Sequence, residues 1–473
     1  MLFNSFIFFI FLGVVLPIFY WLPNKTSKNL FLLISSYFFY GYWDWRFLLL
    51  LALSTVIDFY IGKTMYNTVD EKKRKNLLLV SLFANLGILG FFKYYNFFIE
   101  SFTDISSDIG WDLDYLHLNI ILPVGISFYT FQTLSYTLDI YRKRLEPTTN
   151  FLDFALFVSF FPQLVAGPIE RASALLPQLS KKLVPTKEQI KSGVVLIITG
   201  LFRKVMIGDT AGRYVDHIFG DLNGYASIEL LAALVLFSIQ IYADFSGYSR
   251  IARGTSKLLG IELMKNFEQP YLSRNITEFW RRWHISLSSW LKDYLYISLG
   301  GNRGGVNRTY RNLMITMLLG GLWHGASWNF VIWGGLHGIY LAVHKLFLGT
   351  KKPNTENITK LDVVSILNII LTYILVLFTW LFFRSTSWES TMLFFNRIIH
   401  WHPSEYAGLF ISITASYMLL ILVLDILEYK YNSHAYLLQF KKPIAIGVLA
   451  AMLVVSFIYM FQADPLPFIY FQF

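Results

Sequence analysis

The segment Gly320-Gly-Leu-Trp-His-Gly-Ala-Ser-Trp-Asn329 lies at the junction of two apolar stretches, 310–323 and 327–348. A helix needs about 20 mostly apolar residues to cross the hydrocarbon core of a bilayer, which is about 30 Å thick. The two stretches therefore predict a pair of membrane helices, of which the first is short. An ionisable group at membrane depth is costly and is usually retained for function. His324 is therefore a candidate for the functional site.

The composition of the whole chain is typical of a membrane protein. Of its 473 residues, 55% are hydrophobic and 15% are charged, whereas a soluble domain averages about 45–50% apolar and about 25% charged residues. Aromatic residues make up 18% of the chain, and amphipathic rings prefer the two membrane–water interfaces. Because there is no cysteine, a disulfide framework, a thiolate metal site and an acyl-cysteine intermediate are all excluded.

The net charge of +10 comes largely from basic residues in short clusters between the apolar stretches. This distribution is typical of cytoplasmic loops under the positive-inside rule and does not favour nucleic-acid binding. Residues 1–22 are apolar but lack a basic n-region and a small-residue cleavage site, so we interpret them as a retained first helix rather than a signal peptide. The basic clusters are Lys72–Lys75, Arg142–Arg144, Lys181–Lys182, Arg203–Lys204, Lys351–Lys352 and Lys441–Lys442.

The apolar stretches predict an all-α, polytopic integral membrane protein with roughly 11–13 membrane helices, some of them short or re-entrant. Stretches 151–166 and 310–323 are too short to span, which points to an internal site, because irregular backbone at that depth must be buried or line a cavity. The region 250–311 is polar enough to leave the membrane and is interpreted as interfacial. We interpret residues 1–473 as one membrane-embedded domain. The predicted spans after the first are 29–43, 46–66, 77–100, 119–140, 151–166, 193–212, 228–245, 310–323, 327–348, 362–383, 407–428 and 443–462.

Two histidines are candidate catalytic residues, and each has a structural alternative. A neutral imidazole such as that of His324 can take a proton from a hydroxyl nucleophile and later return it. The glycines that flank His324 would equally suit a close helix contact in which the histidine is only structural. His284 lies in Phe279-Trp-Arg-Arg-Trp-His-Ile-Ser-Leu-Ser288, where the residues alone favour an interfacial charged face that reaches toward lipid headgroups.

Other polar residues carry weaker signals. The glycine-rich loop 299–305 with Arg303 has the composition of a phosphate-binding loop, but it lacks Gly-Lys-Ser/Thr and a preceding strand, so an ordinary turn is favoured. Asp139 and Asp244 could each pair with a nearby arginine or polarise a catalytic group, and the structural pairing is favoured. Two histidines at 400 and 402 lack a third ligand nearby, so no metal site is predicted.

Taken together, these segments resemble the membrane-bound O-acyltransferase family and, within it, the alginate O-acetyltransferase (AlgI-like) branch. The matching segments occur in the family's order and span most of the chain. By this resemblance, His324 corresponds to the family's invariant catalytic histidine and His284 to its second, assisting histidine. The matching segments are Asp244-Phe-Ser-Gly-Tyr-Ser249, Asn275-Ile-Thr-Glu-Phe-Trp-Arg-Arg-Trp-His-Ile-Ser-Leu287, Gly300-Gly-Asn-Arg303, Gly320–Asn329, Phe382-Phe-Arg384 and Phe468-Ile-Tyr-Phe-Gln-Phe473.

The resemblance implies helices around a central tunnel and an acyl group that passes from a cytoplasmic thioester to a hydroxyl on the outer side of a bacterial inner membrane. The expected donor is acetyl-CoA, a substrate rather than a bound cofactor. The expected receiver is an extracytoplasmic partner of the serine-hydrolase type, which acetylates a polysaccharide such as alginate or peptidoglycan. In such a site the base would be His324, the oxyanion donors would come from His284, Asn302 or the Trp323 indole, and the anionic donor would be attracted by arginines. These arginines are Arg281, Arg282 and Arg303.

Two other functions remain open at this point. The teichoic-acid D-alanyltransferase branch of the same family would use a carrier protein's phosphopantetheine arm, but its members tend to be shorter and the terminal motif favours the acetyl branch. A polysaccharide or lipid transporter is the alternative from another class. Transporters commonly contain two-fold internal repeats with discontinuous helices in both halves, and none is visible in this sequence.

Overall fold

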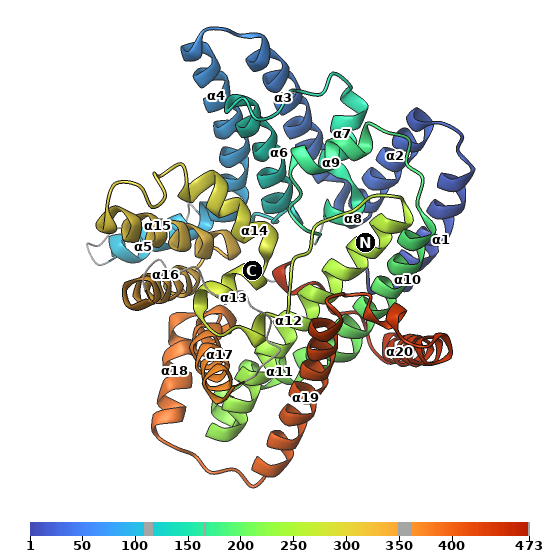
Figure 1. Ribbon diagram of the computed structural model, residues 1–473. Helices are drawn as coiled ribbons and strands as arrows, with labels where there is room; N and C mark the ends of the chain where they lie inside the picture. Colours follow the sequence, from blue (N-terminus) through green and yellow to red (C-terminus); the bar gives the residue numbers. More distant parts are fainter. Residues whose placement is uncertain (108–116, 165–166, 349–361, 472–473) are drawn as a thin grey trace. The chain divides into compact units, whose positions relative to one another are not determined.

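The computed structural model describes residues 1–107, 117–164, 167–348 and 362–471 (Figure 1). Within these ranges every regular element is helical, and seven helices are long and apolar enough to cross a membrane. The predicted all-α, polytopic membrane fold is therefore confirmed. The seven helical stretches, of which the first two each contain more than one helical element, are Lys25–Asn67, Glu71–Thr103, Ser227–Leu258, Trp328–Phe347, Val363–Arg384, Ala407–Tyr431 and Lys442–Gln462.

The contacts divide the chain into two compact units, one of residues 1–194 with 252–264 and one of residues 195–251 with 265–473. The first unit contains most of α10, and helix α12 has residues in both. The interpretation of residues 1–473 as a single domain stays a prediction. The helices of the first unit are α1 (Phe6–Trp21), α2 (Lys25–Asp44), η1 (Trp45–Phe47), α3 (Leu48–Asn67), α4 (Glu71–Leu89), η2 (Gly90–Tyr94), α5 (Tyr95–Ser107), α6 (Ile126–Tyr141), α7 (Phe151–Ser159), α8 (Phe161–Leu164), α9 (Ala172–Leu179) and α10 (Lys187–Leu201).

Helices α3, α4 and α6 lie side by side in the first unit (Figure 1), and polar side chains join them. The carboxylate of Asp58 in α3 is fully buried and accepts hydrogen bonds from the Ser81 hydroxyl, at 2.6 Å, and from the Asn85 amide, at 2.9 Å. Both donors lie on α4. Hydrogen bonds of this kind hold helices together where apolar contacts gain nothing over lipid. In the same unit the stretch 151–166 is broken between α7 and α8, as predicted.

The second unit contains the longer C-terminal helices and several irregular turns. Residues 202–209 form a π-helix, η4, between α10 and α11, and a second π-helix, η7, follows α14. The elements of this unit are η4 (Phe202–Asp209), α11 (Thr210–Gly220), η5 (Leu222–Gly224), α12 (Ser227–Leu258), η6 (Pro270–Leu272), α13 (Ile276–Arg282), α14 (Ile285–Trp290), η7 (Leu291–Tyr296), α15 (Val306–His324), α16 (Trp328–Leu348), α17 (Val363–Arg384), α18 (Trp388–Ile399), α19 (Ala407–Tyr431), η8 (Tyr436–Gln439), α20 (Lys442–Gln462) and η9 (Ile469–Phe471).

Side-chain caps fix where several of these helices begin. Asp362 accepts a hydrogen bond from the Ser365 N–H at 3.0 Å and starts α17, and the Ser387 hydroxyl accepts from the Ser390 N–H at 3.2 Å and starts α18. Such caps satisfy backbone N–H groups that have no partner within the helix. They place the start of α17 within one residue of the predicted span 362–383.

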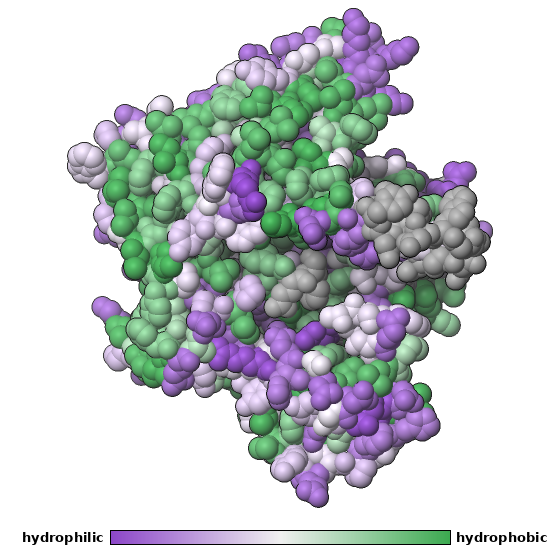
Figure 2. Space-filling model, turned by 180° about the vertical axis from the view of Figure 1, so that it is seen from behind, coloured by the Kyte–Doolittle hydropathy of each residue, from purple (hydrophilic) through white to green (hydrophobic). Residues whose placement is uncertain are grey.

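The long helices differ in how much protein surrounds them. Within an apolar stretch of 18 residues in each helix, 83% of the residues are buried in α12, whereas only 11% are buried in α19 and in α20. Leu419 of α19 and Ile446 of α20 are more than half exposed. Apolar surface of this kind, which covers much of the face in Figure 2, requires lipid around it.

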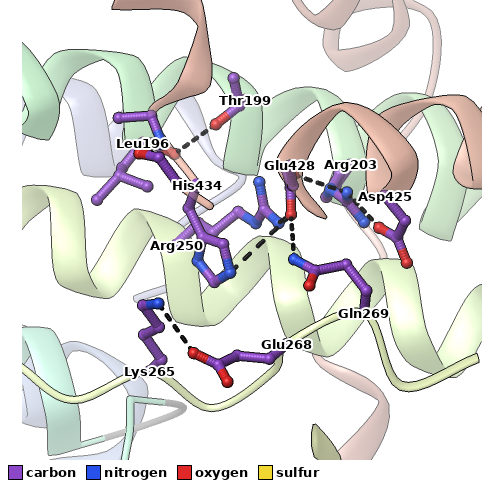
Figure 3. Close-up of polar contacts among 12 residues, drawn as sticks. Leu196, Thr199, Arg203, Arg250, Lys265, Glu268, Gln269, Asp425, Glu428 and His434 are labelled. Atoms are coloured by element: carbon purple, nitrogen blue, oxygen red, sulfur yellow. Dashed lines mark hydrogen bonds and ion pairs between the residues drawn. The ribbon is translucent and has the colours of Figure 1, made fainter. Parts of the chain in front are cut away.

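The structure overturns the interpretation of Arg203–Lys204 as a cytoplasmic loop cluster. Both side chains are only 1% exposed and lie within η4. The Arg203 guanidinium bonds the carboxylates of Asp425, at 2.7 Å, and Glu428, at 2.9 Å, both on α19 (Figure 3). These acids compensate the buried charge, and they lie too far along the chain to be recognised from the local sequence.

The same buried group corrects the predicted boundary of the polar region 250–311. Helix α12 continues to Leu258, and the Arg250 guanidinium bonds Glu428 at 2.6 Å (Figure 3). The Gln269 amide donates to the same carboxylate at 3.3 Å, and the Tyr242 hydroxyl donates to Asp425 at 3.1 Å. The beginning of the region is therefore protein interior rather than membrane interface. We call Arg203, Arg250, Asp425 and Glu428 the buried charge group.

Candidate active site

The two predicted catalytic histidines lie together in the second unit. His324 is the last residue of α15, and His284 lies between the short helices α13 and α14. Their ring centroids are 6.3 Å apart, and the residues are only 3% and 0% exposed. Forty residues separate them along the chain, so it is the fold that brings the two imidazoles into one site.

His284 has a backbone conformation that few residues of its type adopt. Its φ of 41° and ψ of 55° lie in the left-handed region, which costs a non-glycine residue of order 1–3 kcal/mol and persists only where the surroundings enforce it. Asn266 holds the backbone in this conformation. Its carbonyl accepts a hydrogen bond from the Ile285 N–H at 2.9 Å, and its side-chain oxygen accepts one from the Ser286 N–H at 3.3 Å. Asn266 therefore orients His284, a role with no local sequence signal.

The interfacial interpretation of His284 is wrong. The side chain packs edge-on against Phe245, with ring centroids 4.6 Å apart, and lies 5.7 Å from the Trp323 ring. His284 is outside the spanning helices but inside the protein, and this burial lowers its pKa to about 3. At neutral pH the ring is therefore uncharged, with one nitrogen able to donate a hydrogen bond and the other able to accept one.

Helices α15 and α16 are neighbours (Figure 1), and glycines let them approach closely next to His324. A side chain at Gly334 would overlap the Met317 carbonyl oxygen and lie 3.0 Å from its carbon. One at Gly325 would lie 2.8 Å from the Phe330 Cζ atom. Gly334 therefore serves the helix contact, which was one of the two alternatives for the motif, and Gly325 leaves room for the Phe330 ring just after α15 ends with His324.

Aromatic rings enclose His324. Its ring lies 5.1 Å from Trp323, 5.0 Å from Trp333, 5.2 Å from Phe383 and 5.3 Å from Tyr470, measured between centroids. Trp323 also faces His284, so this predicted residue belongs to the same cluster. Such surroundings exclude water and strengthen any electrostatic interaction with a reacting group.

The last described residues of the chain form one wall of this site. The Ile469 N–H donates to the Asp244 carboxylate at 2.7 Å, which anchors η9 on α12. Tyr470 then lies beside both histidines, 5.3 Å from His324 and 6.1 Å from His284. Among the described residues its buried hydroxyl has no hydrogen-bond partner. Residues 472 and 473 of the terminal motif lie outside the described residues.

Asp244 is held by a lysine rather than by the predicted arginine. The Lys204 ammonium group bonds Asp244 at 2.8 Å and Asp209 at 2.6 Å. Lys204 and Asp209 are five residues apart, the repeat at which a π-helix brings side chains together. Gly208 allows the close approach of η4 to α12, since a Cβ atom there would lie 3.0 Å from the Asp244 nitrogen. The pairing is structural, as predicted, with a different partner.

The remaining predicted residues are not in contact with the histidines in the part of the chain that the structure describes. Arg281, Asn302 and Arg303 are exposed. Arg282 is half-buried, and its guanidinium bonds Glu278 at 2.8 Å and the Glu268 carbonyl at 3.1 Å. Arg281 and Arg303 are therefore more accessible to an anion than Arg282. Nor do the described ranges place three or more acidic or histidine side chains where they would hold a metal ion.

The loop that carries Asn302 and Arg303 is built as a turn. Gly300, Gly301, Gly304 and Gly305 all have positive φ. The Asn312 amide donates to the Leu299 carbonyl at 3.0 Å and to the Gly301 carbonyl at 2.9 Å. These bonds hold the loop on α15 and leave Arg303 at its exposed tip.

Comparison with known proteins identifies the family. The profile of the membrane-bound O-acyltransferase family matches residues 38–388. A probable alginate O-acetylase AlgI of Pseudomonas aeruginosa is 43% identical over 410 residues, which are 86% of this chain and 76% of the relative. A peptidoglycan O-acetyltransferase of Helicobacter pylori is 34% identical over an alignment that covers 95% of this chain and 92% of the relative.

A third relative represents the D-alanyl branch. The teichoic acid D-alanyltransferase of Streptococcus thermophilus is 29% identical over 248 residues, which cover 48% of this chain and 58% of the relative. The two acetyl-transferring relatives thus match this chain over a greater length and at higher identity. The described helices, the matched range and these relatives agree: the chain is an enzyme that belongs to the membrane-bound O-acyltransferase family.

Proposed function

We propose that the protein moves an acetyl group from cytoplasmic acetyl-CoA to a hydroxyl on the outer side of a bacterial inner membrane, for the O-acetylation of an extracytoplasmic polysaccharide. The observation that carries this proposal is the pair of buried imidazoles, 6.3 Å apart, within an aromatic enclosure. Relatives named for acetyl transfer to alginate and to peptidoglycan support the acetyl group and the polysaccharide class. The receiver is an extracytoplasmic partner of the serine-hydrolase type.

In the proposed reaction, His324 removes the proton of the attacking hydroxyl as its oxygen bonds to the thioester carbonyl carbon. The tetrahedral intermediate carries a negative charge on the former carbonyl oxygen, and donors near the pair stabilise it. The hydrogen-bond donors near the histidine pair are His284 itself, the Trp323 indole N–H and the Tyr470 hydroxyl. The C–S bond then breaks, and the proton held by His324 passes to the thiolate of the leaving coenzyme A.

The donor is bound through charge rather than through the histidines. Coenzyme A carries phosphates, and Arg281 and Arg303 are exposed cations in a segment that is cytoplasmic in this proposal. Charge-assisted contacts of this kind attract an anion but contribute little free energy each when they are exposed. Binding and chemistry are therefore separable by mutation.

The direct test uses purified protein in detergent with radiolabelled acetyl-CoA, with and without the product of a neighbouring gene. We expect His324→Ala to lower acetyl transfer by about 10²–10⁴-fold, while His400→Ala, at an exposed histidine on the end of α18, leaves it unchanged. A His324→Ala protein that transfers acetyl groups at the rate of the unmodified protein would contradict the proposal. Transfer of label from a D-alanyl carrier protein supplied as donor, with none from acetyl-CoA, would indicate D-alanyl transfer instead.

A further inference from the structure

His337 is a third buried histidine, on α16, and both of its ring nitrogens have defined partners. The Trp280 indole N–H donates to its Nδ1 atom at 3.3 Å. Its Nε2 atom lies 3.0 Å from the Thr379 hydroxyl, and that hydroxyl donates its own hydrogen to the Val376 carbonyl at 2.7 Å. The proton between Nε2 and Thr379 must therefore sit on Nε2. These bonds fix a single neutral tautomer and join α13, α16 and α17.

The ring of His337 also orders the aromatic wall behind His324. It stacks on Phe279 with an interplanar angle of 6° and lies 4.8 Å from the Trp333 ring. Trp333 in turn meets His324 edge-on, with centroids 5.0 Å apart and planes at 84°. Trp280 touches both His337 and Trp333, at 5.0 and 5.7 Å. A continuous series of ring contacts thus runs from His337 through Trp333 to His324.

We propose that His337 is a positioning residue for acyl transfer: its hydrogen bonds to Trp280 and Thr379 fix its ring, the ring packs against Trp333, and Trp333 fixes the ring of His324. The inference rests on the proposed role of His324. A histidine suits this position because it accepts on one edge and donates on the other while remaining flat and uncharged. Misplacing a reacting group by about 1 Å can cost about 100-fold in rate. Loss of the packing around Trp333 should therefore lower the rate of the chemical step.

Two substitutions at His337 separate positioning from filling of space. Phenylalanine keeps a ring but loses both hydrogen bonds, whereas glutamine can still accept from Trp280 and donate to Thr379. We expect His337→Phe to lower kcat by about 10-fold or more with KM for acetyl-CoA changed by less than about 2-fold. His337→Gln should recover most of that loss.

The same helix offers a matched control. His344 lies seven residues further along α16 and bonds Thr277 through its Nδ1 atom at 3.0 Å. Among the ring contacts of the described residues, none joins His344 to His324. His344→Phe should therefore leave kcat unchanged. Thermal unfolding in detergent, measured for each variant, shows whether the variants remain folded.

Three results would overturn the inference. They are a wild-type kcat in His337→Phe, a loss that His337→Gln fails to recover, and an equal loss in His344→Phe. If His337→Phe does not fold, Thr379→Val removes the acceptor of the Nε2 proton at nearly constant volume and should lower kcat in the same way. An active His324→Ala protein would contradict the proposed function itself. If His324→Ala is inactive but Thr379→Val has the kcat of the unmodified protein, only the proposed role of His337 is contradicted.

Discussion

Replacing Gly334 by alanine tests how strictly the contact between α15 and α16 positions the site. The new Cβ atom would overlap the Met317 carbonyl oxygen and lie 3.0 Å from the Met317 carbonyl carbon and 3.2 Å from the Leu318 Cα atom. Nonbonded carbon atoms are at their optimal separation at about 3.5–4.0 Å. All three opposing atoms belong to the backbone, so no side chain can rotate away. The two helices must separate by about 1 Å, judged from that optimal spacing.

The cost follows from two opposing effects. Overpacking of a close contact typically destabilises by about 1–3 kcal/mol, while alanine gains up to about 1 kcal/mol over glycine in helix propensity. The net loss of stability should therefore be small, at about 0–2 kcal/mol. The effect on activity should be larger, because Gly334 is next to Trp333 and α15 carries His324. A displacement of about 1 Å predicts a loss of up to about 100-fold in kcat.

Gly447→Ala is the matched control, because nothing lies within 4 Å of a Cβ atom at that position in α20. The assay measures acetyl transfer from labelled acetyl-CoA together with the unfolding temperature in detergent. We expect Gly447→Ala to match the unmodified protein and Gly334→Ala to lose activity while it remains folded. If Gly334→Ala keeps both kcat and unfolding temperature, the idea that this close contact sets the geometry of the site is refuted.

Three further predictions concern donor binding, the terminal segment and topology. Arg303→Ala should raise KM for acetyl-CoA several-fold and make it more dependent on salt, with a smaller change in kcat; unchanged donor affinity would remove Arg303 from the donor site. Asp244→Ala takes away the acceptor of the Ile469 N–H and one of the two carboxylates that pair with Lys204, a loss of at least about 1–3 kcal/mol of local stability, so limited proteolysis should cut near Tyr470 faster than in the unmodified protein; equal digestion would show that Asp244 does not anchor the segment. Single cysteines placed at the exposed positions Lys72, Lys73 and Lys75 should resist an impermeant maleimide in intact cells, because short basic loops stay in the cytoplasm; labelling there would reverse the proposed orientation.

The spanning helices could be predicted from the sequence because the hydrocarbon core of a bilayer requires a long apolar stretch in each of them. The apolar stretches 327–348 and 407–428 correspond to α16 and α19 within three residues at each end. Helix α18 was not predicted, since it is a short helix with polar residues on one side, and a search for apolar stretches does not find it. Helix α15 is longer than its predicted span because it begins at Val306 and includes the polar residues Asn307, Arg308 and Thr309.

The candidate site was predictable only in part. The apolar surroundings and glycines identified His324 as a candidate, whereas the assignment of His284 to the site came from the resemblance. Composition alone placed His284 at the membrane surface, because the arginines beside it dominate that segment. Asn266 and Lys204 act through backbone conformation and through partners distant in the sequence. No local pattern reports such contacts, and only the folded chain reveals them.

The buried charge group constrains how this sequence can vary over time. Two arginines and two carboxylates sum to zero, and replacing one member leaves an uncompensated charge in the interior, at a cost of about 3–5 kcal/mol. Acceptable changes at positions 203, 250, 425 and 428 should therefore occur in pairs that preserve neutrality, such as an arginine and an acid lost together to apolar residues. Related sequences should show these four positions covarying across more than 170 intervening residues, with the α12–α19 pair Arg250 and Glu428 changing in step.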